Sequence, residues 1–237
     1  MDRNSLREEI MRDAMLHKYE RCRKAWNEIF SNANKDVPSK ASTGNEIFDS
    51  GIEWVCAGVE RILDFGCGDG TLLFICALLG TKYHIGIDFS DRGIEIANNK
   101  KTMMPYGEYE FICGNIEKIG KIEDSSIDAV ILSNIVDNLY PEDADMLLSE
   151  VSRVLKGGGR VLVKLNPCLT AEQIEEWHIK VIRDNLLDDG LILWNNTTDE
   201  WREFFARYFC ICDYREIYYP EYQQTNRMFL LKKNEVS

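Results

Sequence analysis

The sequence is poor in several features that mark broad classes of protein. Basic residues are outnumbered, because 28 Lys and Arg stand against 40 Asp and Glu, for a formal net charge of -12 over 237 residues. Duplex-binding surfaces carry a basic excess, so we expect no nucleic-acid partner and no anionic membrane partner. No run approaches the ~18 apolar residues of a membrane-spanning helix, and the first residues, MDRNSLREEIMRD, hold no apolar signal core. We therefore expect a soluble, cytoplasmic protein.

The sequence also lacks the cysteine pattern of a disulfide scaffold or a zinc site. Its 8 cysteines are few for this length and fall mostly in apolar runs such as 111–113 and 209–212, which predicts buried free thiols. Cys210 and Cys212 are too close together for a zinc pair and have no second pair to complement them, so we predict no metal site. With 5 prolines and 45% hydrophobic residues, the chain is typical of one ordered globular unit.

Short apolar runs alternate with helical patterns along most of the chain. Strands are predicted at residues 61–65, 83–88, 108–113, 127–132, 160–166, 209–219 and 228–232. The clearest helix is 141–155, which begins with Pro141 and acidic residues; Ser90 and Thr170 are predicted N-caps of two others. This alternation predicts an α/β fold, a doubly wound, mostly parallel seven-stranded sheet whose last two strands form an antiparallel edge hairpin.

Two helical stretches, 5–30 and 45–58, precede the first strand. We expect residues 1–59 to form a helical cap or lid, and residues 60–237 to form the ligand-binding domain within a single globular unit.

The most informative segment is the glycine turn that follows the first strand. Gly66, Gly68 and Gly70 alternate between a buried strand and a helix, so the backbone can turn sharply and approach a ligand closely. Ligands of open α/β sheets bind at the carboxyl ends of the strands. Asp88 ends the next strand, where a carboxylate can accept both hydroxyls of a ribose. The turn and this acid together predict a nucleoside site.

The residues around the turn indicate which nucleoside. A dinucleotide motif, G-x-G-x-x-G, requires a third glycine at position 71, where this chain has Thr71. Asp64 and Asp69 flank the turn with negative charge, which repels a diphosphate and attracts a cation. The pattern therefore favours a nucleoside without phosphates.

On these motifs the chain resembles the class I S-adenosylmethionine-dependent methyltransferases, over about residues 60–166. Further matches are the fourth strand with the segment up to Asn134 and the turn at 156–162. The resemblance implies S-adenosylmethionine as cofactor and S-adenosylhomocysteine as product. It assigns the methionine end to the glycine loop, the ribose to the acid after the second strand, the adenine to residues after the second and third strands, and the methyl to the end of the fourth. The corresponding residues are Asp64, Gly66, Cys67 and Gly68 for the methionine end, Asp88 for the ribose, Phe89, Asn115 and Ile116 for the adenine, and Ser133 for the methyl group.

The chain departs from the family at two places. Asn115 stands where the family usually has aspartate, although its carbonyl can still accept from the adenine amine. Asn138 stands where the family often has histidine, and the Asn/Asp-Pro-Pro-aromatic tetrad of many DNA and some protein N-methyltransferases is absent. Together with the excess of acidic residues, these departures favour a small-molecule O, N or C acceptor over a protein acceptor.

No catalytic residue can be named from the sequence. His17 lies in the first helical stretch, His84 inside the second strand, where packing is the better interpretation, and His178 in the helix predicted after the fifth strand. Tyr19 and Trp26 share one helix face and either close over the crevice or dock the helix on the core. Residues 191–196 are a candidate flap.

Two other functions share these motifs. A non-catalytic S-adenosylmethionine-binding adaptor or regulatory protein would carry all of them, because each motif binds cofactor and none performs chemistry. An NAD(P)-dependent oxidoreductase is disfavoured by Thr71 and by the edge hairpin.

Overall fold

A seven-stranded sheet forms the centre of the computed structural model, which describes residues 18–234. The strands are β1 (Arg61–Phe65), β2 (Tyr83–Asp88), β3 (Glu108–Cys113), β4 (Ile127–Ser133), β5 (Leu155–Leu165), β9 (Cys210–Tyr219) and β10 (Gln224–Lys232). Their order is β3-β2-β1-β4-β5-β10-β9; the first five pair in parallel, and β10 pairs antiparallel with both β5 and β9. The predicted doubly wound sheet with its edge hairpin is confirmed.

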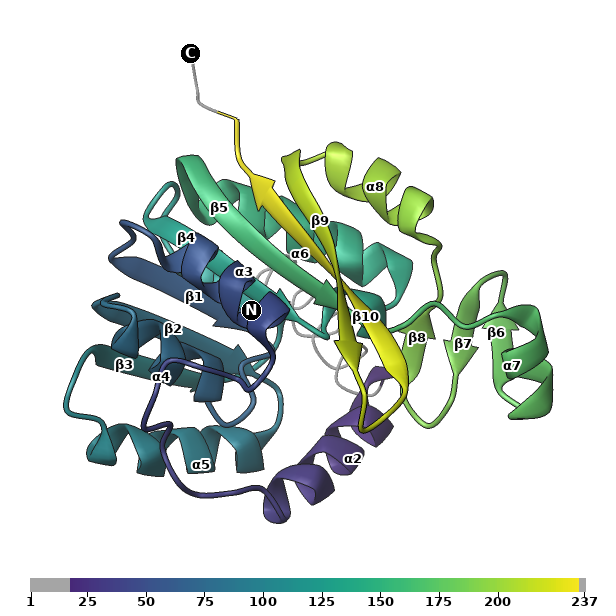
Figure 1. Cartoon of the computed structure of the whole chain (residues 1–237), viewed down its shortest axis with the longest axis horizontal. Helices are drawn as coiled ribbons and strands as arrows, with labels where there is room; N and C mark the ends of the chain where they lie inside the picture. Colours follow the sequence, from purple (N-terminus) through teal and green to yellow (C-terminus); the bar gives the residue numbers. More distant parts are fainter. Residues whose placement is uncertain (1–17, 235–237) are drawn as a thin grey trace, which may run out of the picture.

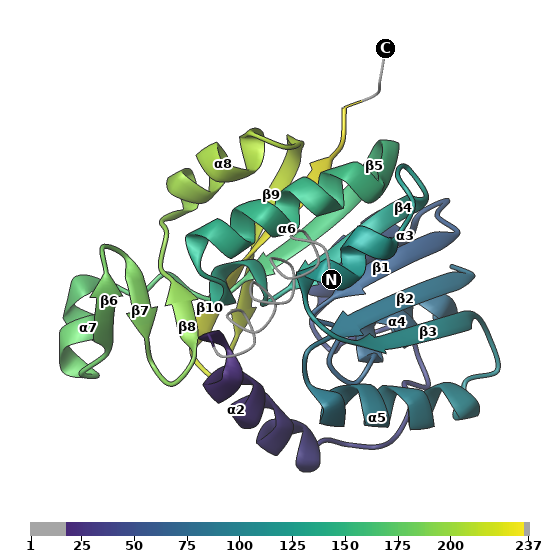
Figure 2. The ribbon, with the colours of Figure 1, turned by 180° about the vertical axis from the view of Figure 1, so that it is seen from behind.

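Helices cover both faces of this sheet (Figures 1 and 2). One apolar cluster joins α3 (Glu46–Cys56), α4 (Thr71–Leu78) and α5 (Asp91–Lys100) to strand residues such as Ile62 and Leu162. The other joins α6 (Pro141–Val154), α8 (Thr198–Ala206) and the short helix η2 (Ile116–Lys121) to Leu63 and Val163. Adjacent residues thus belong to opposite clusters, as the two-residue period of a strand requires.

The helix starts follow the local signals in the sequence. The Ser90 side chain accepts from the Gly93 amide at the start of α5, and Thr170 forms a capping box with Gln173 at the start of α7 (Ala171–Glu176). Pro141 occupies the first turn of α6. Two further short helices, η1 (Lys101–Met103) and η3 (Val136–Asn138), lie in the connections after α5 and β4. Of the two stretches before the first strand, the described parts are α2 (Glu20–Ser31) and α3.

A second, three-stranded sheet follows α7 and was not predicted. It consists of β6 (Lys180–Arg183), β7 (Leu186–Asp188) and β8 (Ile192–Trp194), all antiparallel. The segment 191–196, predicted as a flap, forms β8 and the residues beside it, with Ile192 and Leu193 buried in this sheet, and Leu191 and Ile192 line the cavity described below. Strands of three or four residues are too short for periodicity to reveal.

His178 lies outside the helix in which it was predicted. Helix α7 ends at Glu176, and His178 adopts φ 53 beyond it. Its amide donates to the Glu175 carbonyl, and the Ile179 amide donates to the Ile174 carbonyl. This is a Schellman termination, in which a left-handed residue stops the helix.

All eight cysteines lie within the described residues and are unpaired. Cys22, Cys56, Cys67 and Cys76 are buried as expected of free thiols. The prediction is wrong for the other four, which are exposed: Cys168, in the connection between β5 and α7, and Cys113, Cys210 and Cys212, which lie on β3 and β9, the two edge strands of the sheet. Within residues 18–234, no helix combines the length and apolar character needed to cross a membrane.

Candidate active site

The glycine turn joins β1 to α4 at the point where strand order reverses between β1 and β4. Gly66, Gly68 and Gly70 adopt φ of 82, 52 and 79, values that strain any residue with a Cβ. The amides of Gly66 and Cys67 both donate to the Ile87 carbonyl, at 2.8 and 3.2 Å, which ties the turn to β2. The sequence signal therefore corresponds to a backbone that only glycine readily adopts.

Asp88 closes this turn from the tip of β2. Its Oδ2 accepts from the Gly68 amide at 2.8 Å and its Oδ1 from the Ser90 amide at 2.7 Å. The side chain is buried, and burial raises the pKa of Asp88 to about 6 against the opposing effect of the two amides. Each carboxylate oxygen keeps a lone pair for a ligand hydroxyl.

Asp64 ends β1 next to the turn and is 1% exposed. Neither of its carboxylate oxygens has a hydrogen-bond partner among the described residues. Burial first, then the charges of Asp88 and Asp69, raises its pKa well above the ordinary value. A buried carboxylate without a partner is costly, so a cation bound nearby relieves a penalty that the free protein carries.

Asp69 differs from the other two acids, because its charge is already neutralised. Its Oδ2 accepts from Lys100 Nζ at 2.6 Å, and its Oδ1 accepts from the hydroxyl of Thr71 at 2.7 Å. The Lys100 side chain is 2% exposed. The expected repulsion of a diphosphate by Asp69 is therefore weakened, and Asp69 fastens the turn to α5.

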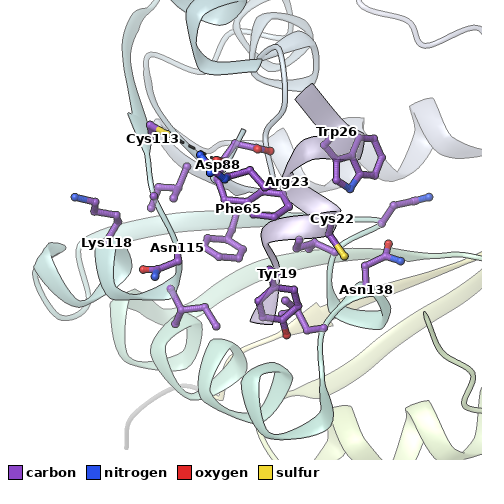
Figure 3. A pocket seen from close by; sticks show the side chains of 18 of the residues that line it. Tyr19, Cys22, Arg23, Trp26, Phe65, Asp88, Cys113, Asn115, Lys118 and Asn138 are labelled. Atoms are coloured by element: carbon purple, nitrogen blue, oxygen red, sulfur yellow. Dashed lines mark hydrogen bonds between the residues drawn. The ribbon is translucent and has the colours of Figure 1, made fainter. Parts of the chain in front are cut away.

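A cavity of about 470 Å³ opens at the carboxyl ends of the parallel strands (Figure 3). Most of the residues predicted from the sequence line it, whereas Asp64, Cys67 and Gly68 do not. The lining members of that set are Gly66, Asp88, Phe89, Asn115, Ile116 and Ser133. Asn115 also caps η2, because its Oδ1 accepts from the Glu117 amide at 3.1 Å. The structure thus gathers residues from four strand ends around one cavity.

Helix α2 supplies a wall that sequence reasoning largely missed. Tyr19, Cys22, Arg23 and Trp26 line the cavity (Figure 3), as does Phe30. Both interpretations of Tyr19 hold, since it lines the cavity and is also buried in the core. No local pattern signals that Cys22, Arg23 and Phe30 face strands far along the chain.

Helix α2 is anchored at both ends. The Tyr19 hydroxyl donates to Asp143 Oδ2 at 2.6 Å and accepts from the Tyr140 amide at 2.9 Å. Burial and the Asp143 carboxylate raise the pKa of Tyr19. Toward the other end, Asn27 Oδ1 accepts from the Ser90 hydroxyl at 2.6 Å. Figures 1 and 2 show α2 extending from α5 toward the small sheet.

Phe30 packs directly on the glycine turn. A Cβ added at Gly68 would lie 2.6 Å from the Phe30 ring, and one at Gly93 would lie 3.2 Å from it. These two glycines therefore let α2 approach the loop closely.

The far end of the cavity is neutral and apolar. Asn134, Ile135 and Asn138 follow β4, and Leu191 and Ile192 come from the small sheet. Among the described lining residues of this end, none is histidine or a carboxylate. His84 is remote, bonded to Thr81 and to the Glu108 carbonyl, and burial lowers its pKa to about 4. His17 lies outside the described residues.

Comparison with known proteins places the chain in context. Residues 58–207 match the family model described as "Methyltransferase domain". The chain is 38% identical over 111 residues to an arsenite methyltransferase of Mus musculus, covering 43% of this chain and 29% of that protein. It is 24% identical over 155 residues to the tRNA N(3)-cytidine methyltransferase METTL2 of Danio rerio, covering 62% and 43%. The chain thus spans less than half the length of these relatives.

A solved structure shares the fold along nearly the whole chain. It is the Burkholderia thailandensis 1,6-didemethyltoxoflavin-N1-methyltransferase, with 1,6-didemethyltoxoflavin and S-adenosylhomocysteine bound. The TM-score is 0.62 at 12% identity, covering 99% of this chain and 92% of that one.

Proposed function

Because this chain belongs to the class I S-adenosylmethionine-dependent methyltransferases, we propose that it transfers the methyl group of S-adenosylmethionine to a small-molecule acceptor. The observation that carries the proposal is the single cavity that runs from Asp88 at the tip of β2 to the neutral wall formed by Asn138 and Ile192. One end suits a cationic nucleoside, and the other leaves room for a second molecule.

The residues of the acidic end fit the cofactor. We propose that Asp64 and the glycine turn, Gly66, Cys67 and Gly68, hold the methionine end. The carboxylate of Asp64 has no hydrogen-bond partner among the described residues, and the ammonium group of the methionine would supply a positively charged one. Cys67 and Gly68 would act through their backbone, since the Cys67 side chain does not line the cavity and Gly68 has none.

The remaining cofactor contacts follow the strand ends. We propose that Asp88 accepts the ribose hydroxyls, that Phe89 lies along the adenine, and that Asn115 and Ile116 contact its edge. Ser133 lies beside the methyl group in this proposal. The lining of the cavity by all of these residues supports the assignment.

The chain promotes transfer by holding the reactants rather than by supplying a nucleophile. The cofactor provides an activated methyl group on sulfonium sulfur, and displacement requires the acceptor atom, methyl carbon and sulfur to lie in line. We propose residues 1–59 as a cover over the domain formed by 60–237, with α2 excluding water from the reacting groups. The anchoring of α2 at Tyr19 and Asn27 supports this role.

A small molecule is favoured over tRNA by two observations. The net charge of -12 opposes binding of a polyanion. The acceptor end is also enclosed by α2 and β8, and the lining side chains after β4 and from 191–192 are neutral. We further propose a cytoplasmic location, which the eight unpaired cysteines support.

Methyl-labelled S-adenosylmethionine tests the proposal directly. The protein is incubated separately with fractionated metabolites, total tRNA and cell protein, with Asp88→Ala as the blank. We expect label in the metabolite fraction alone. Label in tRNA or protein would contradict the acceptor class, whereas cofactor binding without transfer to any fraction would support the adaptor function instead.

A further inference from the structure

A buried lysine lies beside the acceptor end without lining the cavity. Lys164 is on β5, paired in register with Ser133 of β4, and is 9% exposed. Its ammonium lies 5.4 Å from the ring centres of both Phe48 and Tyr219. Among the described residues, its side chain donates one hydrogen bond, to Asn134 Oδ1 at 2.6 Å. The charge is thus directed at one carboxamide.

Three carboxamides continue from that contact. Asn134 Nδ2 donates to Asn166 Oδ1 at 2.8 Å, and Asn166 Nδ2 donates to Asn138 Oδ1 at 3.2 Å. Asn138 Nδ2 then donates to the Ile192 carbonyl at 2.7 Å. We call this series, from Lys164 to the Ile192 carbonyl, the carboxamide relay.

The direction of the carboxamide relay is fixed by its two ends. An ammonium can only donate hydrogen bonds, and a backbone carbonyl can only accept them. Turning any one carboxamide over would place oxygen against oxygen or nitrogen against nitrogen at its contacts. Burial lowers the pKa of Lys164 to about 8, opposed by the charge of Asp137, so at pH 7 the ammonium form predominates.

The backbone holds the relay in place as well. Asn134 adopts φ 55, a left-handed conformation that asparagine tolerates better than most residues, and its amide donates to the Lys164 carbonyl at 2.7 Å. The Asn166 amide donates to the buried Asp137 carboxylate at 2.6 Å, and Arg227 donates to the Asn166 carbonyl. The backbone of Asn166, the middle residue of the relay, is therefore fixed by contacts outside the cavity.

Asn134 and Asn138 line the cavity, whereas Lys164 and Asn166 do not. A carboxamide offers two N–H groups and two oxygen lone pairs. The relay uses one of each on both residues, which leaves one donor and one acceptor on each for a ligand. A neutral group that both donates and accepts, such as an amide, a hydroxyl or the edge of a nitrogen heterocycle, matches them.

We propose that Lys164 is a positioning residue, which orients Asn134 and Asn138 through the carboxamide relay to bind a neutral polar group of the methyl acceptor. The inference rests on the proposed function for its ligand, but the orientation itself needs neither cofactor nor acceptor. It can therefore be tested separately.

The test compares Lys164→Met, Lys164→Arg and a control, Lys82→Met, by NMR of protein carrying ¹⁵N in its asparagine side chains. Lys82 is exposed and paired with Glu60, away from the relay. In Lys164→Met we expect the NH₂ signals of Asn134 and Asn138 to shift and to exchange with water about three- to tenfold faster, as for one lost hydrogen bond. Lys164→Arg should restore the wild-type signals, and Lys82→Met should leave them unchanged.

Unchanged Asn134 and Asn138 signals in Lys164→Met would overturn the proposal. Should that variant fail to fold, Asn134→Asp serves instead, because aspartate tolerates the left-handed backbone and keeps the contact with Lys164 but cannot donate to Asn166. In Asn134→Asp, shifted NH₂ signals of Asn166 and Asn138 would support the relay, and unchanged signals would refute it.

Binding of S-adenosylhomocysteine separates this inference from the proposed function. We expect the Lys164→Met variant to bind S-adenosylhomocysteine as the wild type does. Once an acceptor is identified, the variant should raise KM for that acceptor more than it lowers kcat. Absence of cofactor binding in the wild type would instead refute the proposed function and leave the NMR outcome to decide the relay.

Discussion

The two ends of the cavity are built from the same sheet but carry opposite chemistry. At the ends of β1 and β2, Asp64 and Asp88 are buried carboxylates whose pKa is raised. Beyond the end of β4, the corresponding polar groups are the carboxamides of Asn134 and Asn138. The acidic end carries a penalty that a cation relieves, whereas the residues that line the neutral end, Asn134, Ile135, Asn138, Leu191 and Ile192, are uncharged. In the proposed function, the cationic cofactor occupies the acidic end and a neutral group of the acceptor occupies the other.

The ends also differ in how they are enclosed. The acidic end is formed by a glycine turn fastened to β2 and α5 through backbone bonds and the Asp69 to Lys100 ion pair. The neutral end is closed by parts that come from outside the main sheet, namely α2 and β8. Cofactor specificity therefore depends on a rigid loop, and acceptor specificity on elements that can vary without changing the sheet.

The largest expected effect comes from removing the ribose carboxylate. We predict that Asp88→Ala lowers affinity for S-adenosylhomocysteine by about tenfold or more, because charge-assisted hydrogen bonds shielded from water are lost. Asn138→Ala, at the neutral end, should change it by less than about twofold. Isothermal titration calorimetry measures both affinities. Equal affinities in the two folded variants would contradict the assignment of the cofactor to the acidic end.

The pKa of Asp88 makes the two ends respond differently to pH. Its carboxyl binds a proton more tightly in the folded chain than in the unfolded chain. The contribution of Asp88 to the free energy of unfolding therefore falls as pH rises from 3.8 to about 6. Ribose binding needs the carboxylate, so affinity for S-adenosylhomocysteine should fall below pH 6, by about tenfold at about pH 5. Calorimetry and urea unfolding across pH, with Asp88→Asn as the control, check both trends; an identical pH dependence in that variant would exclude Asp88 as their cause.

Asp64 offers a test in which stability and binding change in opposite directions. Asp64→Asn removes a buried charge but keeps a polar amide, so the free energy of unfolding at pH 7 should rise by about 1 kcal/mol. Affinity for S-adenosylmethionine should fall, because its ammonium loses an anionic partner. Urea unfolding and calorimetry measure these quantities. A destabilised variant with wild-type affinity would show that Asp64 serves the fold alone.

The smallest effect is expected at the adenine edge. Asn115→Asp restores the residue typical of the family, keeps an oxygen that can cap η2, and adds a charged acceptor for the adenine amine. We predict a gain of about threefold or less in affinity for S-adenosylhomocysteine, because the amide oxygen already accepts this bond. A loss of affinity would place Asn115 away from the adenine.

Local patterns predicted the parts of the molecule that depend on local chemistry. The bounds of β1, β2 and β3 follow from apolar runs that end in glycine or acid, and Ser90 caps α5 as its position indicates. Asp88 was found because it ends a strand. By contrast, Phe30 meets Gly68 and Gly93 only through packing between distant segments, which no spacing in the sequence encodes.

The carboxamide relay escaped prediction for a similar reason. Asn134, Asn138 and Asn166 are ordinary polar residues in the sequence, and only the parallel pairing of β4 with β5 brings Lys164 beside them. The small sheet of β6, β7 and β8 was missed because its strands are too short to show a period. In the proposed function these later parts of the chain enclose the acceptor, so the sequence is least informative about the end of the cavity where substrate choice would be made.

We expect the acidic end of the cavity to bind a cationic nucleoside without phosphates. Titration of the wild-type protein with S-adenosylmethionine, S-adenosylhomocysteine and NAD in matched calorimetry tests it most directly. We predict one site per chain for each of the first two ligands and no saturable heat for NAD. Saturable binding of NAD, with none of S-adenosylmethionine, would contradict the account.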